Sequence, residues 1–164
     1  MREILFRGKA VNREKGSHRT SYKNGDWVYG LITRLYDERF ELLPAEMRDE
    51  NGVSGIEIDY RTIGQYTGLT DKNGKKIFEG DIVKFIHKGK PKFNDDFPFN
   101  FEVGEPYSRN YKIEYINTFA SYGLRFINGS IHFPCKQSTL LMYDCEVIGN
   151  IHDNPELLKG GAKK

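Results

Sequence analysis

The stretch GLTDKNGKK, residues 68–76, holds the residue types most suggestive of chemistry in this chain. A glycine opens it, a Gly-Lys pair nearly closes it, and its aspartate and asparagine carry oxygen atoms of the kind that coordinate calcium. A phosphate-binding loop needs a glycine, four residues and then Gly-Lys-Ser/Thr, followed by a helix. Here five residues separate Gly68 from Gly74, Lys76 replaces the hydroxyl, and a strand-like run follows. The spacing therefore argues against a nucleotide site.

The same stretch also lacks the spacing of a calcium-binding loop. An EF-hand loop places a glycine at its sixth position and a glutamate at its twelfth, whereas Gly74 is only the fourth residue counted from Asp71. Asn73-Gly74 instead favours a tight turn, because these residue types tolerate a positive φ. We therefore expect the tip of a β-hairpin with exposed lysines.

Other catalytic and metal-binding patterns are missing from the sequence. The histidines are far apart and form no His-x-His or His-x-x-x-His pair: His18, His87, His132 and His152. No Gly-x-Ser-x-Gly elbow occurs. The carboxylate pairs Asp95-Asp96 and Glu79/Asp81 are interpreted as turn residues that cap backbone amides. We expect no metal, no cofactor and no catalytic site.

The two cysteines, Cys135 and Cys145, are separated by nine residues and form no Cys-x-x-Cys motif. Buried thiols are the simplest interpretation. A disulfide between neighbouring strands stays open on geometric grounds, although a reducing cytoplasm disfavours it.

The composition favours β-structure and a soluble, cytoplasmic protein. The 164 residues include 11 Phe, 10 Tyr and 17 Gly, which is typical of strands joined by tight turns. A net charge of +2, from 25 basic and 23 acidic residues, predicts no attraction to nucleic acids or membranes by charge alone. No apolar run approaches the ~20 residues that span a bilayer, and the N-terminus does not resemble a secretory signal.

The pattern along the chain predicts short strands. Residues 2–11 and 26–36 are β-rich and flank a polar segment, which indicates a long N-terminal hairpin. Residues 36–52 fit either a short helical turn or a loop. Residues 55–64 alternate apolar and polar side chains, as in a strand with one buried face.

The end of the chain carries helix-start signals. Asn154 as N-cap and Pro155 at the first helical position predict a short terminal helical turn. We divide the chain into an N-terminal β-rich region, a second β-domain and a disordered tail, at residues 1–62, 63–158 and 159–164.

Two sets of residues are candidates for binding. The first combines positive charge with an aromatic ring, as single-stranded nucleic acids require: Tyr66, Lys72, Lys75, Lys76, Lys88 and Lys90, with Phe78 and Phe85 between them. Lysines on a hairpin also protect a strand edge from unwanted pairing, so both interpretations stay open. The second set lies in 87–110, which we predict to be a long loop that contacts the body or a partner: Phe93, Phe97, Phe99 and Phe101.

The ordered motifs of the chain resemble the YopX family, whose members are encoded by bacteriophages and prophages. The similarity is carried by REILFRGKAVN, by IGQYTGLTDKNGKKIFEGDIVKF and by CEVIGNIHDNPELL. It implies a mainly β protein of the bacterial cytoplasm whose part from EGDIVKF to EVIGNI is a small Src-homology-type β-barrel. Short alternating strands and tight turns also suit a bent sheet or barrel of about five strands. The 87–110 segment departs from the shorter family pattern.

The resemblance implies no established activity and no catalytic residues. We therefore expect a non-enzymatic interaction module of a phage or prophage that binds a protein or a nucleic acid. A homo-oligomeric assembly protein is the alternative, and an enzyme acting on nucleic acid through dispersed residues is the third.

Overall fold

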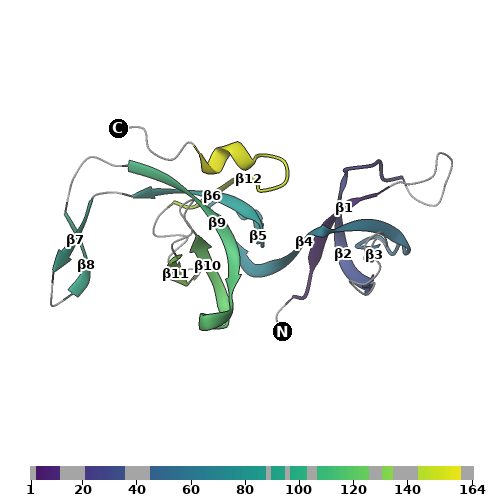
Figure 1. The fold of residues 1–164 in the computed structure, drawn as a ribbon, viewed down its shortest axis with the longest axis horizontal. Helices are drawn as coiled ribbons and strands as arrows, with labels where there is room; N and C mark the ends of the chain where they lie inside the picture. Colours follow the sequence, from purple (N-terminus) through teal and green to yellow (C-terminus); the bar gives the residue numbers. More distant parts are fainter. Residues whose placement is uncertain are drawn as a thin grey trace. The chain divides into compact units, whose positions relative to one another are not determined.

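The computed structural model describes residues 3–11, 21–35, 45–87, 90–94, 97–102, 107–125, 131–134 and 144–159. For residues 87, 90–94, 97–102, 107, 119 and 131–134 it describes the backbone alone. This part of the chain is mainly β, as predicted. The chain forms two compact units, 1–68 and 69–164 (Figure 1). None of the described helices has the length and apolar character that crossing a membrane requires.

In the described part of the N-terminal unit, four strands pair in a closed cycle. They are β1 (Phe6–Ala10), β2 (Trp27–Arg34), β3 (Ala45–Asp49) and β4 (Ile56–Thr70), the last of which continues into the second unit. Each strand pairs antiparallel with the next, and β4 pairs with β1. The predicted hairpin is confirmed, with Phe6 opposite Gly30. Because the pairing closes on itself, one face of the strands points to a shared interior.

The interior of this unit is apolar. Its buried side chains are those of Ala10, Val28, Ala45, Met47, Ile56 and Ile58. The helical turn or loop predicted for 36–52 is wrong for β3, because buried Ala45 and Met47 alternate with more exposed Glu46 and Arg48 at the two-residue period of a strand. Residues 36–44 lie outside the described part.

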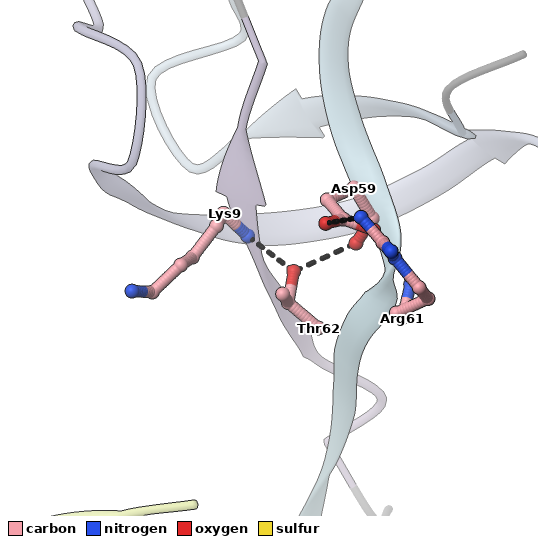
Figure 2. Close-up of polar contacts among 4 residues, drawn as sticks. All are labelled: Lys9, Asp59, Arg61 and Thr62. Carbon is pink, nitrogen blue, oxygen red and sulfur yellow. Dashed lines mark hydrogen bonds and ion pairs between the residues drawn. The ribbon is translucent and has the colours of Figure 1, made fainter. Parts of the chain in front are cut away.

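A bulge in β4 interrupts its pairing with β1, where the register shifts between Arg7 and Lys9. Thr62 closes the bulge: its hydroxyl oxygen accepts a hydrogen bond from the Lys9 backbone N–H (2.8 Å) and the hydroxyl donates to the Asp59 carbonyl (2.7 Å) (Figure 2). The Arg61 guanidinium donates two hydrogen bonds to the Asp59 carboxylate, at 2.9 and 2.7 Å. Local polar contacts therefore stabilise the extra β4 residues that form the bulge. Bulges of this kind bend a strand.

The C-terminal unit contains a five-stranded antiparallel sheet in the order β11-β10-β9-β6-β12. Its elements, in chain order, are β5 (Lys76–Phe78), which precedes the sheet, β6 (Asp81–His87), β9 (Tyr107–Ile116), the 3-10 helix η1 (Asn117–Phe119), β10 (Ser121–Arg125), β11 (Ile131–Pro134) and β12 (Glu146–Asn150). The buried cluster of this unit includes Phe85 and Tyr111, whose rings meet edge to face with centroids 5.3 Å apart.

The long loop predicted for 87–110 is largely strand instead. β7 (Lys90–Asn94) and β8 (Phe97–Glu102) form a two-stranded antiparallel hairpin, and β9 begins soon after it. Aromatic residues at alternate positions of β8 favour this conformation. Pro91 and Pro98 are tolerated because both strands of a two-stranded hairpin are edge strands.

The predicted terminal helical turn is confirmed as the 3-10 helix η2 (Pro155–Leu158), with Pro155 at its first position. Asn154, predicted to cap the helix, makes no capping hydrogen bond with its side chain. Asn150 organises the preceding turn instead, because its side-chain oxygen accepts hydrogen bonds from the backbone N–H groups of residues 152 and 153, at 2.9 and 3.0 Å.

Candidate interaction surface

The stretch 68–76 is a hairpin tip built around Asp71, as its spacing predicts. The Asp71 side chain, only 3% exposed, accepts hydrogen bonds from the backbone N–H groups of Asn73 (2.8 Å), Lys75 (2.9 Å) and Val147 (3.1 Å). Gly74 adopts φ +79°, which favours glycine. The carboxylate is therefore occupied by the protein's own backbone and offers no site for calcium or phosphate.

The predicted lysine set is only partly exposed in the structure. The Lys72 ammonium lies 2.9 Å from the Glu146 carboxylate, and this hydrogen bond raises the pKa of Lys72 above its usual value. Lys75 is exposed, whereas Lys76 is half-buried. Lys88 lies outside the described residues, and the Lys90 side chain is not described.

The aromatic rings assigned to the same set are buried. Tyr66 belongs to the N-terminal unit, whereas Phe78 and Phe85 belong to the C-terminal one, and all three are at most 7% exposed. Stacking on nucleic acid bases requires an accessible ring face. Burial therefore contradicts a stacking role for these rings, which serve the cores of their units.

Of the carboxylates interpreted as turn residues, Asp81 is confirmed in that role, whereas the Glu79 side chain accepts a hydrogen bond from the Tyr115 backbone N–H in β9 (3.4 Å). Asp81 accepts a hydrogen bond from the Phe78 backbone N–H (2.8 Å) in the turn between β5 and β6. The Asp95-Asp96 pair lies outside the described residues. Within the described ranges, no group of three or more His, Cys, Asp or Glu side chains is arranged to hold a metal ion.

The remaining predicted residues are placed only in part. Cys145 is buried, and Cys135 lies outside the described residues. For Phe93, Phe97, Phe99 and Phe101 the backbone positions in β7 and β8 are described, but the side chains are not.

A different surface, on the N-terminal unit, gathers aromatic, cationic and apolar side chains. Lys9 pairs with Trp27, and Arg7 pairs with Tyr29, on adjacent strands. Directly opposite residues of antiparallel strands share a face, and alternation places these four side chains, with Leu31, opposite the buried interior. We call this set the Trp27 face: Arg7, Lys9, Trp27, Tyr29 and Leu31, of which Arg7 is only 6% exposed.

Two cations hold the tryptophan on this surface. The Arg7 guanidinium carbon lies 4.7 Å from the centroid of the Trp27 ring, and the Lys9 ammonium lies 5.5 Å from it. Such cation–π contacts contribute about 0.5–1 kcal/mol each at exposed sites and more when desolvated. The tryptophan is therefore fixed in place while remaining half-buried.

The sequence contains a signal for this surface that periodicity analysis passes over. In β2 the outward positions carry Trp27, Tyr29 and Leu31, while the inward ones carry Val28 and Ile32. A strand with one buried face and one solvent-exposed face needs apolar residues at alternate positions only. Apolar side chains on both faces therefore indicate a second contact surface.

A hollow of about 420 Å³ adjoins the Trp27 face at Leu31. Three segments line it: residues 3–5, residues 30–31 of β2, and residues 48, 49, 50 and 52 at the end of β3 and in the turn after it. Gly30 contributes no side chain, and its backbone approaches β3 closely, because an added Cβ would lie 1.9 Å from the Arg48 carbonyl oxygen. The hollow is open, since Ile4 and Leu31 are both large, apolar and at least half exposed.

The YopX protein family matches residues 30–159 of the chain. This chain belongs to the YopX family. The YopX-family chain is also similar to the crystal structure of protein EF1440 from Enterococcus faecalis, with 26% identity, coverage of 95% of this chain and 98% of that one, and a TM-score of 0.50. No curated protein matches it. The family match begins within β2 and so includes the β2 and β3 lining of the hollow.

Asp49 ties the turn beside the hollow in this YopX-family protein. Its carboxylate accepts hydrogen bonds from the Tyr22 hydroxyl (3.0 Å) and from the backbone N–H groups of Asn51 (3.0 Å) and Val53 (2.8 Å). Desolvation raises its pKa, but these hydrogen bonds outweigh that effect, so the Asp49 pKa lies below its usual 3.8. The ionised form is therefore the one that the fold stabilises.

We expect the N-terminal unit to lose stability in acid for this reason. Because the folded pKa is lowered, the contribution of Asp49 is complete above the usual carboxyl pKa and is lost as the pH falls through the lowered value. Urea unfolding followed by the fluorescence of Trp27 measures this loss between about pH 6 and pH 2. Asp49→Asn should flatten the acid dependence, and parallel pH curves for the two proteins would contradict the assignment.

Proposed function

We propose that this YopX-family protein is a non-enzymatic interaction module of a phage or prophage that binds a protein partner in the bacterial cytoplasm. The observation that supports it is the Trp27 face with its adjoining hollow. Tryptophan and tyrosine are among the residues most enriched at the energetic centres of protein interfaces, and Trp27 and Tyr29 are the accessible ones here. Monomeric proteins rarely leave large apolar side chains clustered without a partner.

The charges around this surface favour a protein over a nucleic acid. Arg61 is paired with Asp59, and Arg34 lies 3.5 Å from Glu46, so neighbouring cations are balanced by carboxylates. Affinity for nucleic acids comes mainly from an excess of positive charge against phosphates. A surface with mixed charges and aromatic residues is instead typical of a protein interface.

We also propose that the C-terminal unit is a small barrel that acts as the scaffold. The outer edge of β12 is tied to the hairpin tip by the Lys72 backbone N–H, which donates to the Cys145 carbonyl (2.9 Å), and by the contact between Val147 and Asp71. A sheet whose edge is bonded in this way is partly closed. This supports the barrel that the family resemblance implies.

Photocrosslinking tests the proposed function. A photoreactive phenylalanine analogue at position 29 of the full chain, expressed in bacteria that carry the phage, should crosslink to one discrete protein. The same analogue at Tyr115, another exposed tyrosine in the C-terminal unit, is the matched control and should not. Leu31→Arg should abolish the product from position 29, because a charge would then occupy the apolar centre of the interface.

Other partners would give different results in the same preparation. A crosslink between two copies of the chain would favour the assembly alternative and contradict the proposal. Saturable, salt-dependent binding of labelled single- or double-stranded DNA or RNA, lost in a Lys72, Lys75 and Lys76 to alanine variant, would favour nucleic acid. Equal crosslinking from both positions, or none, would also count against the proposal.

A further inference from the structure

The hollow exists because the N-terminal segment leaves β2 early. The register of β1 with β2 ends at Phe6 opposite Gly30, whereas β2 continues to Arg34 beside β3. The Leu5 carbonyl accepts a hydrogen bond from the Tyr66 backbone N–H (2.8 Å), which ties this segment to β4 instead. Because the N-terminal segment turns away towards β4, space is left beside residues 30 and 31 of β2, next to the end of β3.

The floor of the hollow is apolar. Leu5 is buried, while Ile4 and Leu31 are 61% and 50% exposed. Covering such side chains is favourable by about 25 cal/mol for each Å² of apolar surface removed from water. The hollow therefore suits an apolar side chain of a partner.

The rim of the hollow carries net negative charge. Glu3, Asp49 and Glu50 line it, with Arg48 as the basic residue among the lining residues. Asp49 is already engaged by its own turn, so the exposed Glu50 decides which charge is attracted from outside. Its carboxylate complements a lysine or an arginine next to the apolar side chain.

From this arrangement we infer that the hollow binds an extended peptide segment of the partner in which an apolar side chain is followed by a basic one. The inference rests on the proposed function and adds the chemistry of the partner's contact. The apolar side chain covers Ile4 and Leu31, and the basic group lies against Glu50. The hollow is the specificity pocket, and the Trp27 face supplies the surrounding contact area.

Amide NMR shifts of the full chain test this with blocked tetrapeptides as probes. Gly-Leu-Lys-Gly should cause saturable shifts at Ile4, Leu31 and Glu50, and Gly-Leu-Glu-Gly and Gly-Ala-Lys-Gly should each bind about fivefold more weakly. Glu50→Lys should reverse the preference between Leu-Lys and Leu-Glu. Glu57→Lys, an exposed change of the same kind elsewhere in this unit, should leave the preference unchanged.

Three outcomes would overturn the inference: no saturable shift at the hollow, equal affinity for all three peptides, or an unchanged preference in Glu50→Lys. If no peptide binds but the analogue at position 29 still crosslinks to a partner protein, the peptide site is contradicted and the proposed function is retained. Failure of both experiments would remove both. Trp27 fluorescence establishes that each variant is folded before titration.

Discussion

Replacing Asp71 with alanine is expected to lower the free energy of unfolding of the C-terminal unit by about 3 kcal/mol. The carboxylate accepts three backbone hydrogen bonds, and the one donated by the Val147 N–H is buried. A buried donor that loses its acceptor costs about 1–3 kcal/mol, and the loss of two turn hydrogen bonds adds to this. Urea unfolding followed by far-UV circular dichroism measures the change, and hydrogen exchange at the Val147 amide localises it.

Lys72→Ala is the matched control at the neighbouring position. It removes an ion pair with Glu146 in which both side chains are partly exposed, and solvent screening makes the contribution of such pairs small. Asp71→Asn should lie between the two, because its amide oxygen can still accept the turn hydrogen bonds. Equal unfolding midpoints for Asp71→Ala and Lys72→Ala would show that the carboxylate does not hold the hairpin tip to β12.

Gly30→Ala should destabilise the N-terminal unit by about 3 kcal/mol through a steric clash. The added Cβ would lie 1.9 Å from the Arg48 carbonyl oxygen and 2.9 Å from the Asp49 Cα, and these are backbone atoms that cannot move without disrupting the pairing of β2 with β3. Trp27, the single tryptophan of the chain, lies on β2 and reports unfolding of this unit. The urea midpoint of its fluorescence is the measurement.

Gly55→Ala separates a clash from backbone strain. Gly55 has φ +75°, but no atom lies within 4 Å of the position that its Cβ would take. Alanine at position 55 should lower the free energy of unfolding by about 1 kcal/mol, because only the strain of the left-handed conformation opposes it. A urea midpoint shift for Gly30→Ala no larger than that for Gly55→Ala would mean that β2 and β3 can move apart without loss of stability. The strands that line the hollow would then not be rigid.

The elements that the sequence predicts best are those that depend on the conformational preferences and side-chain alternation of their own residues. The alternation in 55–64 identifies β4, and the Asn73-Gly74 pair identifies the turn after it, because a tight turn depends on the φ preference of its own residues. Pro155 marks the start of η2 for a similar reason. These elements need no information from distant parts of the chain.

The segments 36–52 and 87–110 show where local patterns fail. Each mixes charges or prolines with apolar residues, and each contains a strand that is stabilised by its partners: β3 between β2 and β4, and β8 by β7. Strand formation depends on cross-strand contacts more than on intrinsic preference. Sequence alone does not show which segments pair.

The candidate surface was missed for the same reason. Tyr66, Phe78 and Phe85 combine with lysines in the sequence, but the fold buries the rings. The Trp27 face brings residues 7 and 9 together with residues 27–31 only because β1 and β2 pair in one register. A shift of that register by one residue would point the apolar residues of one strand to the other face.

The sequence by itself determines that the protein is mainly β, that it belongs to the YopX family and that residues 68–76 are a turn, because strand periodicity, motif order and glycine conformation are properties of short stretches. The tertiary structure alone decides the closed pairing of the first four strands, the burial of the aromatic rings and the hollow beside Gly30. These features depend on contacts between residues far apart in the chain. Such contacts form, and stabilise the protein, only after the strands have paired.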